Sequence, residues 1–223
     1  MLKHALALVV GFGLSVVAAA PDGAQQASQR PRTSLYVLDF AGDGIKLTSP
    51  ERGVAFDIEG TGERIRVGWT EAGSDDAFLG LDVNGNGTID STRELISTRT
   101  ELSPPTNIRS ANEVVNVLQG LLRGPDGRLP TPLPPGAARF DRNDKAFNSV
   151  LVWADTNHDG RSSGTELRTL DAAEVEAIYG GFRRTQDVDA QGNQTLLRGN
   201  FWLMRRGVEL QRDLAVVILA GTP

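Results

Sequence analysis

Two acidic stretches carry oxygen-bearing side chains at the spacing of a calcium-binding loop. Calcium takes about six to eight oxygen ligands, and an EF-hand loop of twelve residues supplies them from positions 1, 3, 5, 7, 9 and 12, with a glycine at position 6. The stretch from Asp155 to Glu166 meets each of these requirements, and Gly160 is its position 6. Position 8, usually aliphatic, is Ser162. The predicted ligands are Asp155, Asn157, Asp159, the carbonyl of Arg161, Ser163 and Glu166.

The stretch from Asp82 to Glu94 follows the same order with one displacement. Position 12 is Arg93, whose side chain cannot bind a cation, so the glutamate must come from position 13. Its predicted ligands are Asp82, Asn84, Asn86, Thr88, Asp90 and Glu94. Together the two stretches predict about two bound Ca²⁺ ions. Plain turns are built from the same residue types, which is the alternative interpretation of each stretch.

Three further acidic segments are weaker candidates. Asp39 to Gly44 and Asp57 to Gly62 repeat the acidic spacing but have no terminal glutamate, so hairpin turns are favoured there. Phe140 to Asp144 could be the end of another loop, although a helix cap formed by Asp141 or Asn143 is favoured. Whether Asp39 and Asp43, or Asp141 and Asp144, contribute a further site stays open.

Composition narrows the classes of function. The chain has 223 residues, of which 39% are hydrophobic and 23% charged, typical of a globular protein. It has no cysteine, which excludes disulfides and cysteine-ligated zinc. The formal net charge is −5, and the basic residues are scattered along the chain. This pattern argues against nucleic acid as a partner.

The N-terminal residues are typical of an export signal. Lys3 precedes an apolar run, Ala5 to Ala20, that ends in small residues. We therefore expect a signal peptide over 1–19, a flexible lead over 20–33 and a calcium-binding domain over 34–223. The protein would be secreted, periplasmic or on the cell surface, with no membrane span after signal removal. An uncleaved membrane anchor is the alternative.

Periodicity predicts an α+β fold, in which small antiparallel β-sheet elements and short helices flank the two loops. A helix is expected behind Ser110, where apolar residues recur with helical spacing as far as Leu121, and a short one over 143–150. Alternating residues predict strands in two groups, of which the first would form its own small sheet. These strands cover 35–38, 44–47, 54–58 and 64–69, and then 178–188, 195–204 and 214–220.

Several stretches resemble the calcium-binding modules of repeats-in-toxin and haemolysin-type secreted bacterial proteins. They are Leu38–Ile45, Val54–Ile58, Phe78–Asp90, Phe140–Phe147 and Leu151–Gly160. The resemblance implies calcium binding, and the late glutamate of the first loop is similar to the family's own spacing. Some relatives cleave themselves at an Asp-Pro bond, which this chain lacks. The glycine-rich nonapeptide repeats of the toxins are absent as well.

The residue types favour a binding protein over an enzyme. His158 is the one histidine beyond the signal segment and there is no cysteine, so a catalytic triad or a histidine-ligated zinc is implausible. An exported glycoside hydrolase with an acidic pair and structural calcium is the alternative. A surface or interaction module that contacts an unknown protein or cell-surface partner through Trp69, Trp153 or Trp202 is a third, although burial in the core is the more ordinary role of tryptophan.

Overall fold

The computed structural model describes residues 33–97, 139–144, 146–180 and 182–222. All of them fall in one compact unit, Pro31–Pro223. Two single turns of 3₁₀ helix, η1 (Pro50–Arg52) and η2 (Phe147–Ser149), accompany eleven strands. The strands are β1 (Leu35–Leu38), β2 (Val54–Phe56), β3 (Ile65–Val67), β4 (Ala77–Gly80), β5 (Arg139–Asp141), β6 (Leu151–Trp153), β7 (Leu167–Thr169), β8 (Val175–Tyr179), β9 (Arg183–Val188), β10 (Gln194–Arg205) and β11 (Val208–Ile218).

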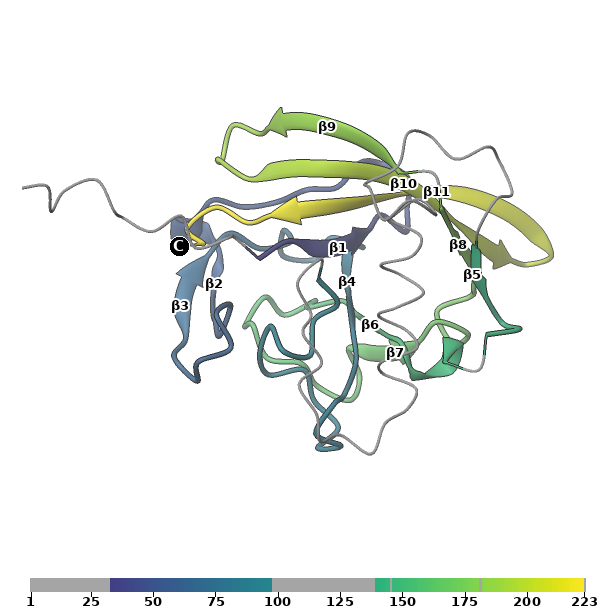
Figure 1. Cartoon of the computed structure of the whole chain (residues 1–223), viewed down its shortest axis with the longest axis horizontal. Coiled ribbons are helices and arrows are strands. Elements are labelled where there is room, and N and C mark those ends of the chain that lie inside the picture. Colours follow the sequence, from purple (N-terminus) through teal and green to yellow (C-terminus); the bar gives the residue numbers. More distant parts are fainter. Residues whose placement is uncertain (1–32, 98–138, 145, 181, 223) are drawn as a thin grey trace, which may run out of the picture. The chain divides into compact units, whose positions relative to one another are not determined.

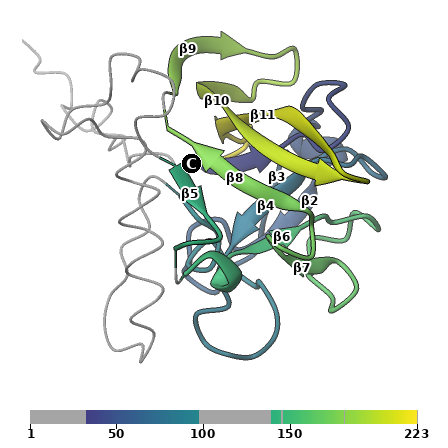
Figure 2. The same cartoon turned by 90° about the vertical axis from the view of Figure 1, so that its right-hand side faces the viewer.

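Nine of these strands form one antiparallel sheet in the order β5-β8-β10-β11-β1-β4-β6-β7, with β9 also paired to β10. The long β10–β11 hairpin, green and yellow in Figure 1, runs next to β1. Figure 2 shows β8 beside β10. Strands β2 and β3 pair with each other in a separate two-stranded sheet. Strand β1 therefore lies between β4 and β11, the last strand of the sheet in sequence order.

The central strands are apolar on both faces because the sheet has a hydrophobic core on each side. In β1, Leu35 and Val37 belong to one core, whereas Tyr36 and Leu38 belong to the other. Successive side chains of a strand point to opposite faces, so a strand covered on both faces shows no apolar–polar alternation. The core around Leu35 and Val37 also contains Phe56 of β2. Val83 of the first acidic loop packs against the other core, whereas Ile89 of the same loop is part of this one.

An aromatic cluster fills this second core. Trp69 lies 4.5 Å from Phe78, 5.0 Å from Phe56 and 5.4 Å from Trp153, measured between ring centroids. Both tryptophans are fully buried, which confirms a core role for them. Trp202 is half-buried and lies 6.0 Å from the ring of Tyr179.

The predicted α+β class is wrong for the described residues, which are almost entirely β and contain no α-helix. Within 143–150 the chain forms only the single 3₁₀ turn η2. The helix expected over 110–121 lies outside the described residues. The separate N-terminal sheet is confirmed only for β2 and β3, because β1 pairs with β11 and β4. Within 44–47, only Leu47 forms a bridge, to Thr70.

Candidate metal centre

Each predicted calcium loop is the connection of a β-hairpin. Strands β6 and β7, on either side of the second loop, pair in antiparallel register. Just inside this pair, the Ala154 N–H donates to the Glu166 carbonyl at 3.2 Å. In the first loop the Leu81 N–H donates to the Glu94 carbonyl at 2.7 Å. The first aspartate and the last glutamate of each loop are thus brought together by strand pairing, without the helices of an EF-hand.

The two loops begin with the same hydrogen-bonded turn. In the first loop, the Asp82 carboxylate accepts the N–H groups of Gly85 at 2.8 Å, Asn86 at 3.1 Å and Gly87 at 2.9 Å. In the second, the Asp155 carboxylate accepts those of Asp159 at 3.1 Å and Gly160 at 2.8 Å. The first carboxylate of each loop is therefore fixed by the backbone that folds around it.

Positions 4 and 6 of both loops lie in the left-handed region. Position 4 is Gly85, with φ 73°, in the first loop and His158, with φ 58°, in the second. Position 6 is glycine in both, Gly87 with φ 79° and Gly160 with φ 67°. Only glycine enters this region without steric cost, which explains its place at position 6. His158 is held in it by a contact of 2.8 Å between its Nε2 and the Arg52 carbonyl.

The terminal glutamates occupy equivalent places although they differ by one position in sequence. Glu94 Oε1 accepts the Asn84 N–H at 3.4 Å, and its Oε2 accepts the Asp90 N–H at 3.1 Å. Glu166 Oε1 accepts the Asn157 N–H at 3.4 Å, and its Oε2 accepts the Ser163 N–H at 3.1 Å. Each glutamate therefore spans positions 3 and 9 of its own loop.

The other predicted ligands follow one another along each loop. Asn84 Oδ1 accepts the Asn86 N–H at 2.9 Å, and Asn86 Oδ1 accepts the Thr88 N–H at 2.8 Å. In the second loop, oxygens of Asn157 and Asp159 accept the N–H two residues further on, at 3.0 and 2.7 Å. The side chains at positions 3 and 5 thus turn inward in both loops. The side chains at position 9 close the ring: Asp90 accepts the Asn86 amide at 3.0 Å, and Ser163 donates to Glu166 at 3.1 Å.

The loops contact each other at position 8. The Ile89 N–H donates to Ser162 Oγ at 2.6 Å, and Ser162 Oγ donates back to the Ile89 carbonyl at 3.2 Å. The hydroxyl of Ser162 thereby satisfies both backbone groups of a residue 73 positions away. The unusual residue at position 8 is what joins the two loops.

Burial disfavours the charged carboxylates of both loops. Burial raises the pKa of Asp155, and the neighbouring carboxylates of Glu166 and Asp159 add to this, whereas the hydrogen bonds from Gly160 and Asp159 act in the opposite direction. Burial likewise raises the pKa of Glu94, helped by the charge of Asp90. A bound cation would relieve this repulsion, because an opposite charge favours the ionised form.

The turn that opens both loops occurs twice more. Asp39 accepts the N–H groups of Gly42 at 2.6 Å and Gly44 at 2.8 Å. Asp57 accepts those of Thr61 at 3.0 Å and Gly62 at 2.8 Å. The Asp57 turn joins β2 to β3, which confirms the predicted hairpin turn there. The Asp39 turn follows β1 but does not close a hairpin, because β1 pairs with β11 and β4.

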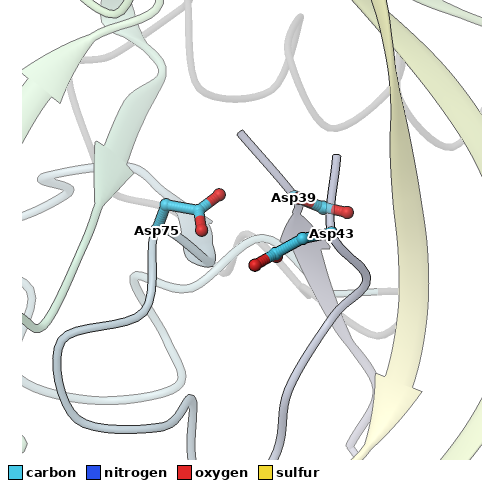
Figure 3. Close-up of side chains that lie close together, drawn as sticks. All are labelled: Asp39, Asp43 and Asp75. Atoms are coloured by element: carbon cyan, nitrogen blue, oxygen red, sulfur yellow. The ribbon is translucent and has the colours of Figure 1, made fainter. Parts of the chain in front are cut away.

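An acidic group lies beside the Asp39 turn. Asp39, Asp43 and Asp75 offer carboxylate oxygens that all lie within 4.8 Å of one another, so they could hold a metal ion (Figure 3). Among the described residues this is the one such group, because the acidic side chains of the two loops do not approach one another as closely. Asp75 was not among the predicted ligands, and the acidic pair Asp75-Asp76 was its only sequence signal.

The weaker candidate after β5 is a local turn. The Asn143 N–H donates to Asp141 Oδ1 at 2.8 Å, and the Asp141 N–H donates to Asp144 Oδ2 at 2.8 Å. These residues cap no helix, so the predicted helix cap is wrong.

A family model for the SPM domain matches residues 36–128 and 135–213 of this chain. The chain belongs to the SPM domain family. Within this match lie both loops and the acidic group. The chain is also 29% identical, over 166 residues, to the iron-regulated protein FrpA of Neisseria meningitidis serogroup C. That alignment covers 74% of this chain but only 14% of FrpA.

The family match corrects the resemblance inferred from the sequence. The calcium-binding module of the repeats-in-toxin and haemolysin-type proteins is the wrong assignment, because the matching model is that of the SPM domain. Most of the stretches that suggested it contain turns rich in Asp, Asn or Gly, which recur in many folds. No helix in the described part of this SPM domain is long and apolar enough to cross a membrane.

Proposed function

We propose that this SPM domain is an exported, non-enzymatic calcium-binding protein whose fold is stabilised by Ca²⁺ at the two paired loops. The observation that carries the proposal is the equivalence of Glu94 and Glu166. Both glutamates span positions 3 and 9 of their loops with nearly the same hydrogen-bond lengths. A carboxylate directed across the loop from the first aspartate is what a bidentate calcium ligand requires.

The surroundings of the loops explain why calcium would stabilise the whole fold. The Arg64 guanidinium donates to the Gly160 carbonyl at 2.9 Å and to the Ala55 carbonyl at 2.5 Å. On the other side, the Thr92 N–H donates to the Asp57 carbonyl at 2.9 Å. The β2–β3 hairpin is therefore attached to both loops and covers the core that contains Trp69 and Trp153. Ordering the loops would order this hairpin as well.

Calcium-dependent melting tests the proposal. Calcium binds the folded loops and not the unfolded chain, so the melting temperature should rise with calcium concentration. Sites of the extracellular class have dissociation constants of about 0.1–1 mM, and the rise should appear over that range. We expect Asp155→Asn and Glu166→Gln to lose much of the rise. Glu209→Gln, an exposed change on β11, serves as the matched control. An equal melting temperature in calcium and in chelator would refute calcium stabilisation.

The proposal of export rests on the N-terminal residues alone. Cleavage after Ala19 should leave Ala20 as the first residue of the mature protein. N-terminal sequencing of protein recovered outside the cytoplasm tests this. Recovery of a chain that still begins at Met1 would contradict it.

A further inference from the structure

The acidic group beside β1 is built on the same turn as the two loops. Asp39 is at position 1 of this turn and Asp43 at position 5, the positions that Asp155 and Asp159 occupy in the second loop. Instead of a glutamate further along the loop, Asp75 approaches from the segment before β4 (Figure 3). The Asp75 carboxylate is held there by a hydrogen bond from the Ala41 N–H.

Strand pairing explains why these distant residues meet. Leu38 of β1 is paired with Ala77 of β4 in antiparallel register. The next residue of β1 is Asp39, and the residue before Ala77 is Asp76, so this register places Asp39 across from Asp76. Asp75 then faces the turn that begins at Asp39.

Asp76 provides an observation independent of the group of three. Its side chain is only 2% exposed, and its Oδ1 has no hydrogen-bond partner among the described residues. Its Oδ2 accepts the Lys46 N–H at 2.9 Å, so the carboxylate faces the segment that contains Asp39 and Asp43. A buried carboxylate oxygen without a hydrogen-bond partner is costly unless another group or an ion pairs with it.

Lys46 pairs with one of these carboxylates but is weakly held, and Arg205 and Arg212 donate to the Phe40 carbonyl in the same turn. Lys46 Nζ lies 2.5 Å from Asp43 Oδ2, and the two side chains are 43% and 52% exposed. An ammonium group at the rim can leave for solvent when a cation enters. Several carboxylate oxygens without a nitrogen or sulfur ligand select a hard cation such as Ca²⁺.

We propose that Asp39, Asp43 and Asp75, backed by Asp76, form a third Ca²⁺ site that ties the turn after β1 to the start of β4. This site does not depend on the two loops, since it shares no ligand with them. The proposed function involves two ions at the two loops. This site would add a third ion and would fix a different element, the turn after β1.

Ion counting tests the proposal. Calcium alone is titrated into the full chain by calorimetry, and bound ions are counted by native mass spectrometry. We expect three ions for the wild type, two for Asp75→Asn and for the exposed change Asp43→Asn, and three for the control Glu209→Gln. A variant with Glu94→Gln and Glu166→Gln should still bind one ion.

The possible ion counts distinguish calcium binding at this site from calcium binding at the two loops. Two ions in the wild type, both lost with Glu94→Gln and Glu166→Gln, would overturn the third site and leave the proposed function intact. One ion that is lost in Asp75→Asn would support the third site and refute binding at the loops. An ion count unchanged by both Asp43→Asn and Asp75→Asn would also overturn the third site.

Lys46 gives a second, more specific test. Lys46→Gln removes the competing ammonium, so calcium should bind the third site several-fold more tightly while the loop affinities stay unchanged. If calcium does not bind at these carboxylates, Lys46→Gln leaves the calcium affinity unchanged and the proposal fails.

Discussion

Ser162 Oγ bridges both backbone groups of Ile89, accepting its N–H at 2.6 Å and donating to its carbonyl at 3.2 Å. This pair joins position 8 of one loop to position 8 of the other. Calcium binding at one loop should therefore favour the bound conformation of the second, because the two backbones cannot move independently at this point.

Removing the bridge should weaken both the fold and calcium binding. Ser162→Ala leaves the buried Ile89 N–H and carbonyl without this partner, which should cost about 1–3 kcal/mol of unfolding free energy. Urea denaturation in chelator measures this loss, and calcium titration should show weaker binding at both loops. Thr165→Ala is the control, since among the described residues its hydroxyl contacts Ser163 of the same loop. Equal effects of the two substitutions would contradict a bridging role for Ser162.

The displaced glutamate of the first loop yields a prediction about two adjacent residues. Glu94 spans the loop, and Arg93 is the residue that the twelve-residue pattern places at the last ligand position. Glu94→Gln should therefore lower the calcium affinity of the first loop at least tenfold. Arg93→Ala should leave it within about twofold, since no carboxylate oxygen is lost. Calorimetric titration of both variants checks this. A comparable loss in Arg93→Ala would show that the loop is closed differently.

The sequence indicated that the two acidic stretches fold back on themselves, but not which elements flank them. The spacing from Asp155 to Glu166 indicates a loop that folds on itself, and the hydrogen bonds bear that out. The EF-hand pattern also suggested flanking helices, whereas Leu167–Thr169 pairs with β6 as a strand. Three-residue strands such as β6 and β7 are too short for periodicity to reveal.

Non-local pairing explains the other misses. Asp75 lies 34 residues from Ala41, whose N–H it accepts, and only the pairing of β1 with β4 brings the two together. The strand predicted over 35–38 is confirmed as β1, but its pairing with β11 and β4 was missed. Neither relationship is contained in a local pattern.

Two glycines at the same position of the two loops should respond differently to alanine. Gly87 and Gly160 both have positive φ, 79° and 67°. A Cβ at Gly87 meets nothing within 4 Å, whereas one at Gly160 lies 2.8 Å from the Ala55 carbonyl oxygen. Gly87→Ala should cost about 1–2 kcal/mol from the left-handed backbone alone. Gly160→Ala should cost clearly more, because the loop must also move away from β2. Chemical denaturation measures the loss of unfolding free energy in each variant. Equal losses would show that the loop moves away from β2 at no cost in stability.

Tyr36 is a buried phenol whose hydroxyl has no hydrogen-bond partner among the described residues. Its ring meets the edge of Phe182, with centroids 6.2 Å apart. Burial raises the pKa of Tyr36 far above its ordinary value, because the charged phenolate would have to enter the core. Tyr36→Phe removes the hydroxyl but keeps the ring, so stability near pH 7 should be unchanged or higher by about 1 kcal/mol. A loss of stability in this variant would show that the hydroxyl has a partner.

The same residue sets a dependence on alkaline pH. Below about pH 10 the phenol is protonated in both the folded and the unfolded chain, and it adds no pH dependence. Above that value the unfolded chain releases the proton while the folded chain retains it, so stability falls as pH rises. The wild type should then lose about 1.4 kcal/mol per pH unit relative to Tyr36→Phe. Urea unfolding of the two proteins in chelator, from pH 8 to pH 11, measures the difference. If the stability of the two proteins changes with pH in the same way, Tyr36 loses its proton in the folded protein as well. Water would then reach Tyr36 in the core.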